Sequence, residues 1–224
     1  MSSPTKVALI ADDDEFFRIA LSAILTSRLK FSEVVQTASL DEAVEKLSAR
    51  DDISLALFDL AMPGMESPAS LKAVRDCFEN LRVAVVSGSD SRGDVLAALE
   101  AGVHGYVLKG LGVNELSQAL QLIVDGVIYV PPSIAILPTT MADRPPAMGR
   151  LTAASNSTLA ALTPRQRDVL ALVVEGQSNK EIARSLQLGE GTVKVHMAAL
   201  FRSLGVKTRT AAAVAGGRLL RERP

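Results

Sequence analysis

Short apolar runs alternate with amphipathic helical patterns along residues 1–130, and this alternation restricts the fold more than any other feature of the chain. Between the runs, apolar residues recur at helical spacing, as at Leu116, Ala119 and Leu120. Three of the runs are nearly continuous, which is typical of parallel strands covered on both faces. We therefore predict a doubly wound α/β fold with a five-stranded parallel sheet. The expected strands are Val7–Ala11, Val34–Val35, Ile53–Phe58, Val83–Val86 and Tyr106–Leu108.

Polar side chains follow four of the expected strands, at the point where each strand ends. Asp12 and Asp13 follow the first strand, Asp59 the third, Ser87 the fourth and Lys109 the fifth. Carboxyl ends of parallel strands meet at one edge of a sheet, where ligands bind, so we expect these side chains to share a cleft. Clustered carboxylates suit Mg²⁺, and beside a cation Asp59 can act as a nucleophile toward a phosphoryl group. Each feature alone is more often a solvated turn, and their combination on one sheet carries the prediction.

Charge and proline content divide the chain into two parts. The whole chain has a net charge of −1, yet residues 1–130 hold 11 basic and 19 acidic residues, and residues 131–224 hold 13 and 6. The parts therefore carry −8 and +7. Half of the 10 prolines lie between residues 131 and 146. We predict a first domain at 1–130, a proline-rich linker at 131–160 and a second domain at 161–224, with different partners.

Composition excludes several classes of protein. A single cysteine argues against a disulfide-stapled secreted module, and no apolar run approaches the roughly 18 residues of a membrane span. The first apolar stretch is too short for a signal peptide. We therefore expect a cytoplasmic protein without a membrane partner. The lone Cys77 is predicted to be a small buried hydrophobe rather than a redox sensor.

The second domain has the pattern of four short helices over residues 161–214. Thr163 can cap the first helix, Pro164 suits its first position, and Gly176 suits its end. Ser178 can cap a second helix, and a turn over residues 188–191 follows it. The sequence thus predicts a compact helical unit after the linker.

The third of these helices, expected at Thr192–Leu204, is basic on one face. That face carries Lys194, His196 and Arg202, and the opposite face is apolar. Short helix, turn and basic helix form a helix-turn-helix pattern whose second helix can fit the major groove of DNA. From pattern alone a solvated basic face is the commoner outcome, so the prediction depends on the specific residues given below.

Residues 6–126 resemble the flavodoxin-like receiver domain of two-component response regulators. The resemblance is carried by Ile10–Asp13, Leu57–Met65, Val85–Gly88 and Ala101–Lys109. It implies that a partner histidine kinase phosphorylates Asp59 and that Tyr106 is an aromatic whose ring position follows the phosphorylation state. It also implies a Mg²⁺ site formed by Asp12, Asp13, Asp59 and the backbone carbonyl of Ala61, with Ser87 and Lys109 binding the phosphoryl group.

Residues from 162 onward closely resemble the LuxR/NarL-type helix-turn-helix. The resemblance is carried by Leu162–Arg165, Asn179–Ala183, Thr192–His196 and Leu204–Val206. It implies that Thr192–Leu204 is the recognition helix. Gln166 departs from the family, which usually has Glu there, so a charge interaction is lost or replaced by an amide. The expected DNA contacts are Lys180, Thr192, Lys194, Val195, His196, Arg202, Lys207, Thr208 and Arg209.

Together these features predict a phosphorylation-regulated transcription factor rather than an enzyme. The receiver would at most catalyse its own phosphorylation and slow dephosphorylation. Expected partners are the histidine kinase, double-stranded promoter DNA and a second copy of the chain, at least when phosphorylated or DNA-bound. One alternative is a phosphorylation-independent DNA-binding protein that uses the receiver only to dimerise, and another is a phosphorelay protein or phosphatase. Opposite charges on the two domains also suggest mutual attraction in the unphosphorylated state.

Overall fold

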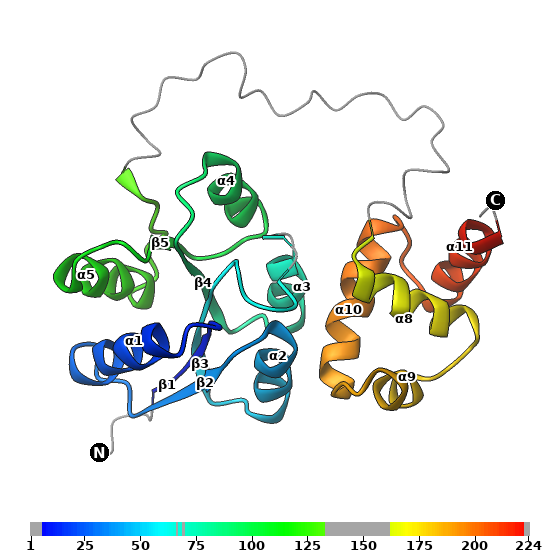
Figure 1. Cartoon of the computed structure of the whole chain (residues 1–224), viewed down its shortest axis with the longest axis horizontal. Coiled ribbons are helices and arrows are strands. Elements are labelled where there is room, and N and C mark those ends of the chain that lie inside the picture. Colours follow the sequence, from blue (N-terminus) through cyan, green and yellow to red (C-terminus); the bar gives the residue numbers. More distant parts are fainter. Residues whose placement is uncertain (1–5, 66, 69, 133–161, 222–224) are drawn as a thin grey trace, which may run out of the picture.

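The computed structural model describes residues 6–65, 67–68, 70–132 and 162–221, which form an α/β domain and a helical domain in contact with each other (Figure 1). The predicted linker at 131–160 lies almost entirely outside these residues, so its limits remain a prediction. Within the described part of the chain, no helix is long and apolar enough to span a bilayer.

The first domain is built on the predicted five-stranded parallel sheet, whose order is β2-β1-β3-β4-β5. The strand order reverses beside β1, which places the predicted cleft at the carboxyl ends of β1 and β3. β2 is longer than its two valines suggested because it lies at an edge, where partly exposed polar residues extend the strand. The strands are β1 (Val7–Ala11), β2 (Glu33–Thr37), β3 (Ile53–Phe58), β4 (Arg82–Ser87) and β5 (Tyr106–Leu108).

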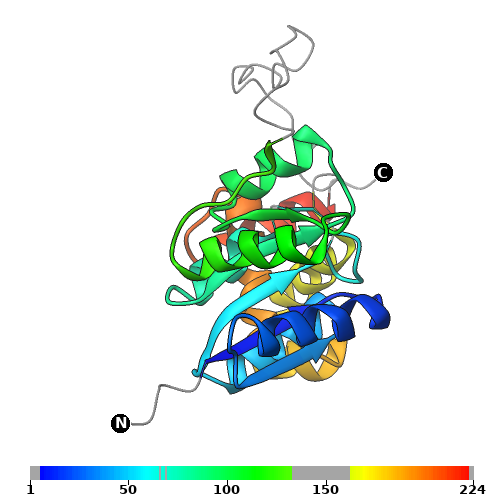
Figure 2. The same ribbon diagram turned by 90° about the vertical axis from the view of Figure 1, so that its left-hand side faces the viewer.

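Helices cover both faces of this sheet, and each face has its own apolar core. Figure 2 looks onto the face covered by α1 (Glu15–Ser27) and α5 (Val113–Val124). The other face is covered by α2 (Leu40–Ala49), α3 (Ser70–Cys77) and α4 (Arg92–Glu100). The predicted fold class is therefore confirmed.

Described residues 162–221 form the four predicted helices around a small core of their own, but the last helix extends past the expected limit of 214 to Arg221. Thr163 and Gln166 exchange hydrogen bonds of 3.0 and 3.1 Å at the start of α8, so the amide of Gln166 replaces the usual carboxylate in a capping box. The expected turn over 188–191 is shorter than predicted, because Gly189 caps a helix that already begins at Glu190. The helices are α8 (Pro164–Val174), α9 (Asn179–Leu186), α10 (Glu190–Ser203) and α11 (Arg209–Arg221).

Cys77 is exposed, so its predicted burial was wrong. Leu71 and Val74 of the same helix are fully buried. Cys77 is the last residue of α3 and no further helical turn covers it. The expected burial failed because the sequence pattern does not show where this helix ends.

Candidate functional site

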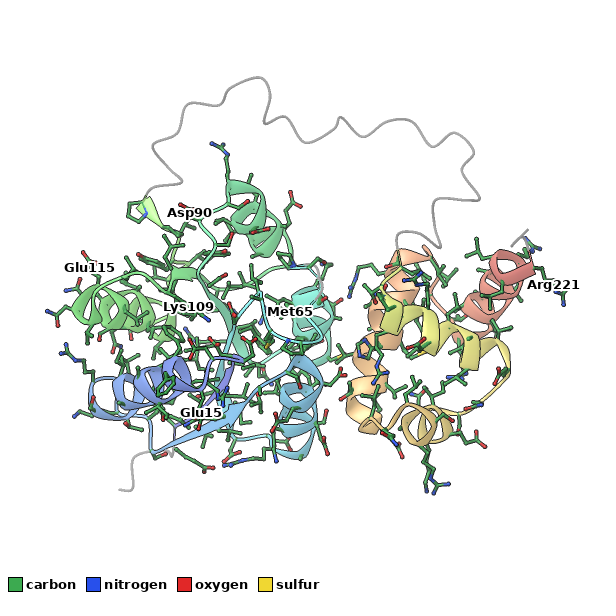
Figure 3. All side chains as sticks on the ribbon, viewed as in Figure 1. Glu15, Met65, Asp90, Lys109, Glu115 and Arg221 are labelled. Atoms are coloured by element: carbon green, nitrogen blue, oxygen red, sulfur yellow. The ribbon has the colours of Figure 1, made fainter. Side chains whose placement is uncertain are left out.

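The carboxyl ends of the strands bring the predicted acidic, hydroxyl and lysine side chains to one edge of the sheet. Figure 3 shows Lys109 in this region, with Glu15, Met65 and Asp90 marking the segments that follow β1, β3 and β4. Lys109 Nζ lies 2.7 Å from Asp12 Oδ2 and 3.2 Å from Asp59 Oδ2. Both carboxylates are almost fully buried, whereas Asp13 is exposed. The predicted side chains therefore converge at this edge, with Asp12 and Asp59 as the buried acids of the cluster.

Burial and pairing act against each other on the charges of this cluster. Burial raises the pKa of Asp12 above its usual value, although the hydrogen bond from Lys109 pulls it down. Burial lowers the pKa of Lys109, but the hydrogen bond to Asp12 and the charge of Asp59 outweigh it, so the net shift is upward. Lys109 is thus held as a cation between two carboxylates.

The cluster has the donor set of a divalent cation site. Carboxylate oxygens of Asp12, Asp13 and Asp59 lie within 4.8 Å of one another. Asp59 Oδ1 is buried and has no hydrogen-bond partner in the described structure, so one oxygen of the predicted phosphoacceptor is available. An unpaired buried carboxylate oxygen is costly, and a hard cation satisfies it. These residues fit a metal ion bound through oxygen.

Ser87 and Tyr106 lie beside the cluster, as the sequence predicted. Ser87 is buried at the end of β4, and its backbone carbonyl accepts a hydrogen bond of 2.8 Å from the amide of Lys109. The ring of Tyr106 is fully buried, and its hydroxyl donates to the carbonyl oxygen of Ser89 at 2.8 Å. Burial raises the pKa of the Tyr106 phenol. The exposed Ala61 lies in the loop after Asp59.

Three residues that follow β1 support the site and were not predicted. Asp14 caps α1, and its amide donates to Asp12 Oδ1 at 2.9 Å. Arg18 Nη1 donates to the backbone carbonyl of Asp12 at 2.6 Å, and the ring of Phe17 lies 4.8 Å from Lys109 Nζ. Residues 17 and 18 lie three and four positions after the cap at Asp14. Residues at this spacing share one side of a helix, so helical spacing could have placed both near Asp12.

The predicted DNA-contacting residues divide into two groups. The first group lies outside α10. Its exposed members are Lys180, Lys207 and Thr208. Arg209 is already engaged, since it donates to Asn179 Oδ1 at 3.0 Å and also to the carbonyl of Gln177. Its contact with DNA phosphate remains a prediction that requires these bonds to be shared or exchanged.

The second group lies on α10, and most of its members face the first domain. α10 packs against α2 and α3, as Figure 1 shows. Thr192, Val195 and His196 are buried, and Val195 belongs to the same apolar cluster as Leu40 of α2. Lys194 is exposed. The face predicted to read DNA is therefore largely covered by the receiver.

Charged and polar pairs line this interface, in keeping with the opposite charges of the two domains. Asp41 of α2 accepts from Thr192 through its carbonyl at 3.1 Å and pairs with His196 Nε2 through its carboxylate at 3.0 Å. Arg165 lies 3.8 Å from the same carboxylate. Arg202 pairs with Asp76 of α3. The expected attraction between the domains thus takes the form of specific contacts.

Comparison with known proteins agrees with both halves of this description. Residues 8–121 match the response regulator receiver domain, and residues 160–215 match the LuxR family of bacterial regulatory proteins. The chain is 34% identical over 209 residues to the glycerol metabolism activator of Pseudomonas putida, covering 93% of this chain and 94% of that protein. It is 32% identical over 206 residues to the nitrate/nitrite response regulator NarL of Escherichia coli K12, covering 92% of each.

Solved structures agree at the level of the fold. A LuxR family two-component response regulator from Aurantimonas is 25% identical, with a TM-score of 0.53, over 58% of this chain and 93% of that one. RcsB of Salmonella enterica serovar Typhimurium, bound to the promoter rprA with the phosphomimetic BeF3⁻, is 22% identical, with a TM-score of 0.53. That alignment covers 94% of this chain and 98% of RcsB.

The fold and the site define a receiver domain with an acidic strand-end cluster, joined to a helix-turn-helix domain. The chain belongs to the LuxR/NarL family of two-component response regulators, which are DNA-binding regulators of transcription. The predicted family and class of function are therefore confirmed, and use of the receiver for dimerisation alone is not favoured.

Proposed function

We propose that this response regulator stores its signal as a phosphoryl group on Asp59 and uses it to release α10 for binding to promoter DNA. The observation that carries the proposal is the burial of Thr192, Val195 and His196 against the receiver. A helix covered in this way cannot lie in a major groove, so DNA and the receiver compete for one surface. We call this arrangement, in which the receiver covers α10, the closed state, and the arrangement with α10 released the open state.

Asp12, Asp13, Asp59 and the carbonyl of Ala61 would hold Mg²⁺ in the acidic cluster. When bound, the cation would neutralise negative charge on the phosphoryl oxygens. The available Oδ1 of Asp59 and the close approach of the three carboxylates support this assignment.

Phosphoryl transfer from a histidine kinase breaks a phosphorus–nitrogen bond on the kinase and forms a phosphorus–oxygen bond to Asp59. The carboxylate is the nucleophile and needs no base to remove a proton. Lys109 is within 3.2 Å of Asp59 and stabilises charge on the transferred group, while the Ser87 hydroxyl donates to one of its oxygens. The same groups would support slow hydrolysis, and we assign the chain no enzymatic activity on other molecules.

In the open state, α10 would enter the major groove, with Lys194 and Val195 reading bases and the remaining cations contacting phosphates. A homodimer would place two recognition helices on half-sites about one helical turn apart. Such a regulator would act in the cytoplasm, where the chromosome is. The rival assignment as a phosphorelay protein or phosphatase leaves the helix-turn-helix domain without a role.

The test is intact-mass analysis of the full chain treated with acetyl phosphate and Mg²⁺, followed by DNA-binding titrations. Wild type should gain one phosphoryl group, lose it on removal of the donor, and bind its target duplex more tightly while phosphorylated. Asp59→Asn should show neither effect. An unmodified wild type, or equal DNA affinity with and without the adduct, would contradict the proposal.

A further inference from the structure

The first residue of α2, Leu40, is hydrogen-bonded to the Asp59 loop, residues 59–65, which follows β3. The amide of Leu40 donates to the carbonyl of Pro63 at 3.0 Å, and Pro63 lies four residues after Asp59. Gly64 follows with a φ of +83°, and a Cβ atom at this position would lie 3.2 Å from Leu40 Cβ. The loop backbone therefore contacts α2 with no side chain between them.

The next residue, Asp41, holds the docked domain at three points. Its carbonyl accepts from Thr192, its carboxylate pairs with His196, and Arg165 lies 3.8 Å away. Asp41 thus directly follows the residue that is hydrogen-bonded to the Asp59 loop. In the described structure it also contacts α8 and α10. Among the described residues, Asp76 lies near the C-terminal end of α3 and pairs there with Arg202 of α10.

Apolar packing connects the same elements. Leu40, Gly64, Val195 and His196 line one small pocket between the domains. Leu40, Val195 and Met62 of the Asp59 loop also belong to a single buried cluster. Close-packed interiors transmit displacements rather than absorbing them, so a shift of this loop reaches α10 through α2.

The aromatic at Tyr106 leads elsewhere. Its hydroxyl bonds to the carbonyl of Ser89, and the hydroxyl of Ser89 bonds to Asp94 of α4 at 2.6 Å. The principal receiver contacts of α10 are with α2 and α3 instead. The route from phosphoacceptor to docked domain is therefore shorter through the Asp59 loop than through α4.

We propose that Asp41 is the element that couples phosphorylation of Asp59 to release of the DNA-binding domain, through the junction of Leu40 with Pro63. This inference rests on the proposed function. A phosphoryl group adds about 1.5 to 2 negative charges and three acceptor oxygens next to this loop. Movement of the loop displaces the start of α2 and breaks the contacts of Asp41 with Thr192 and His196.

The experiment is a cycle that crosses phosphorylation with substitution at the two interdomain carboxylates. Full-length Cys77→Ser protein carries dyes on cysteines introduced at exposed positions of α5 and α11, and energy transfer gives the ratio of open to closed molecules. That ratio is measured with and without acetyl phosphate for the parent, Asp41→Ala and the matched control Asp76→Ala. Intact mass confirms the adduct in each protein.

Allosteric couplings are commonly about 5- to 150-fold, so phosphorylation should raise the parent's open:closed ratio within that range. Both substitutions should raise the ratio without phosphate. Asp76→Ala should keep the parent's phosphorylation factor, whereas Asp41→Ala should reduce it at least about threefold, because interacting perturbations are not additive. Asp41→Asn, which retains an acceptor oxygen for His196, should restore part of the factor.

An unchanged factor in Asp41→Ala, with the adduct present, would overturn the inference and leave the proposed function standing. An equal loss in Asp76→Ala would also overturn it, since Asp41 would then hold no special position. Absence of any adduct on the parent would contradict the proposed function and the inference with it.

Discussion

A single methyl group at Gly191 should open the protein without weakening either domain. Gly191 is in the first turn of α10 and lies against α2, where a Cβ atom would be 2.5 Å from Ser48 Cβ and closer still to Ser48 Oγ. Carbon atoms normally approach no closer than about 3.5 Å. Gly191→Ala therefore cannot be accommodated in the closed arrangement unless α2 and α10 move apart.

The magnitude follows from two opposed effects. Overpacking of a well-packed contact costs about 1–3 kcal/mol, which corresponds to a fall in the closed:open ratio of about 5- to 150-fold. Alanine in a helix is about 0.5–1 kcal/mol more favourable than glycine. That gain applies equally to closed and open molecules, so it stabilises the helical domain and leaves the ratio between the two states unaffected.

The assay is small-angle scattering of the unphosphorylated full chain, combined with DNA-binding titration. Gly191→Ala should increase the radius of gyration and tighten DNA binding without phosphodonor, with no fall in the unfolding temperature of the helical domain. The matched control is Ser48→Gly combined with Gly191→Ala, which removes both clashing atoms; the next nearest atom is the carbonyl oxygen of Val44, at 3.8 Å. The double variant should be closed again. Unchanged scattering and DNA affinity in Gly191→Ala would refute docking through this contact between α2 and α10.

Three further predictions concern the helix caps, the tyrosines and DNA. Thr163→Ala removes one half of the capping box and should lower the free energy of unfolding by about 1 kcal/mol in denaturant titrations, while Arg167→Ala on the exposed side should change it little. Burial raises the pKa of both tyrosines in the chain, so their phenols lose protons at lower pH in the unfolded state than in the folded state. The free energy of unfolding should therefore fall as pH rises above about 10. Ultraviolet titration of the folded protein should show no phenolate step at about pH 10 before unfolding. Lys194→Ala should weaken specific DNA binding more than non-specific binding, whereas Lys180→Ala should weaken both alike; an unchanged preference for the true site in Lys194→Ala would contradict the recognition-helix assignment.

Much of the receiver could be predicted because a parallel sheet converts sequence order into position. The residues after β1, β3, β4 and β5 had to meet at one edge, so Asp12, Asp59, Ser87 and Lys109 could be grouped without coordinates. The cap at Thr163 could also be predicted, because a cap depends only on residues close in sequence. Which oxygens pair with Lys109, and which one remains free, depends on side-chain geometry that spacing does not encode.

The docking of α10 could not be predicted from the sequence. Asp41 has the ordinary appearance of an acidic residue in the first turn of a helix, where it favours the helix dipole. Its role at the interface arises because glycine at positions 189 and 191 lets α10 approach Glu45 and Ser48 closely. Such complementarity between surfaces distant in sequence leaves no periodic signal. The charge asymmetry predicted an attraction between the domains, but it did not predict which surfaces meet.

We expect phosphorylation of Asp59 to exchange a receiver contact of α10 for a DNA contact. The most direct measurement is the affinity of the full-length protein for its target duplex, with and without acetyl phosphate and Mg²⁺, at one fixed salt concentration, for wild type and Asp59→Asn. Phosphorylated wild type should bind at least about fivefold more tightly than unphosphorylated wild type, and the variant should show no change. Equal affinity of phosphorylated and unphosphorylated wild type would contradict it.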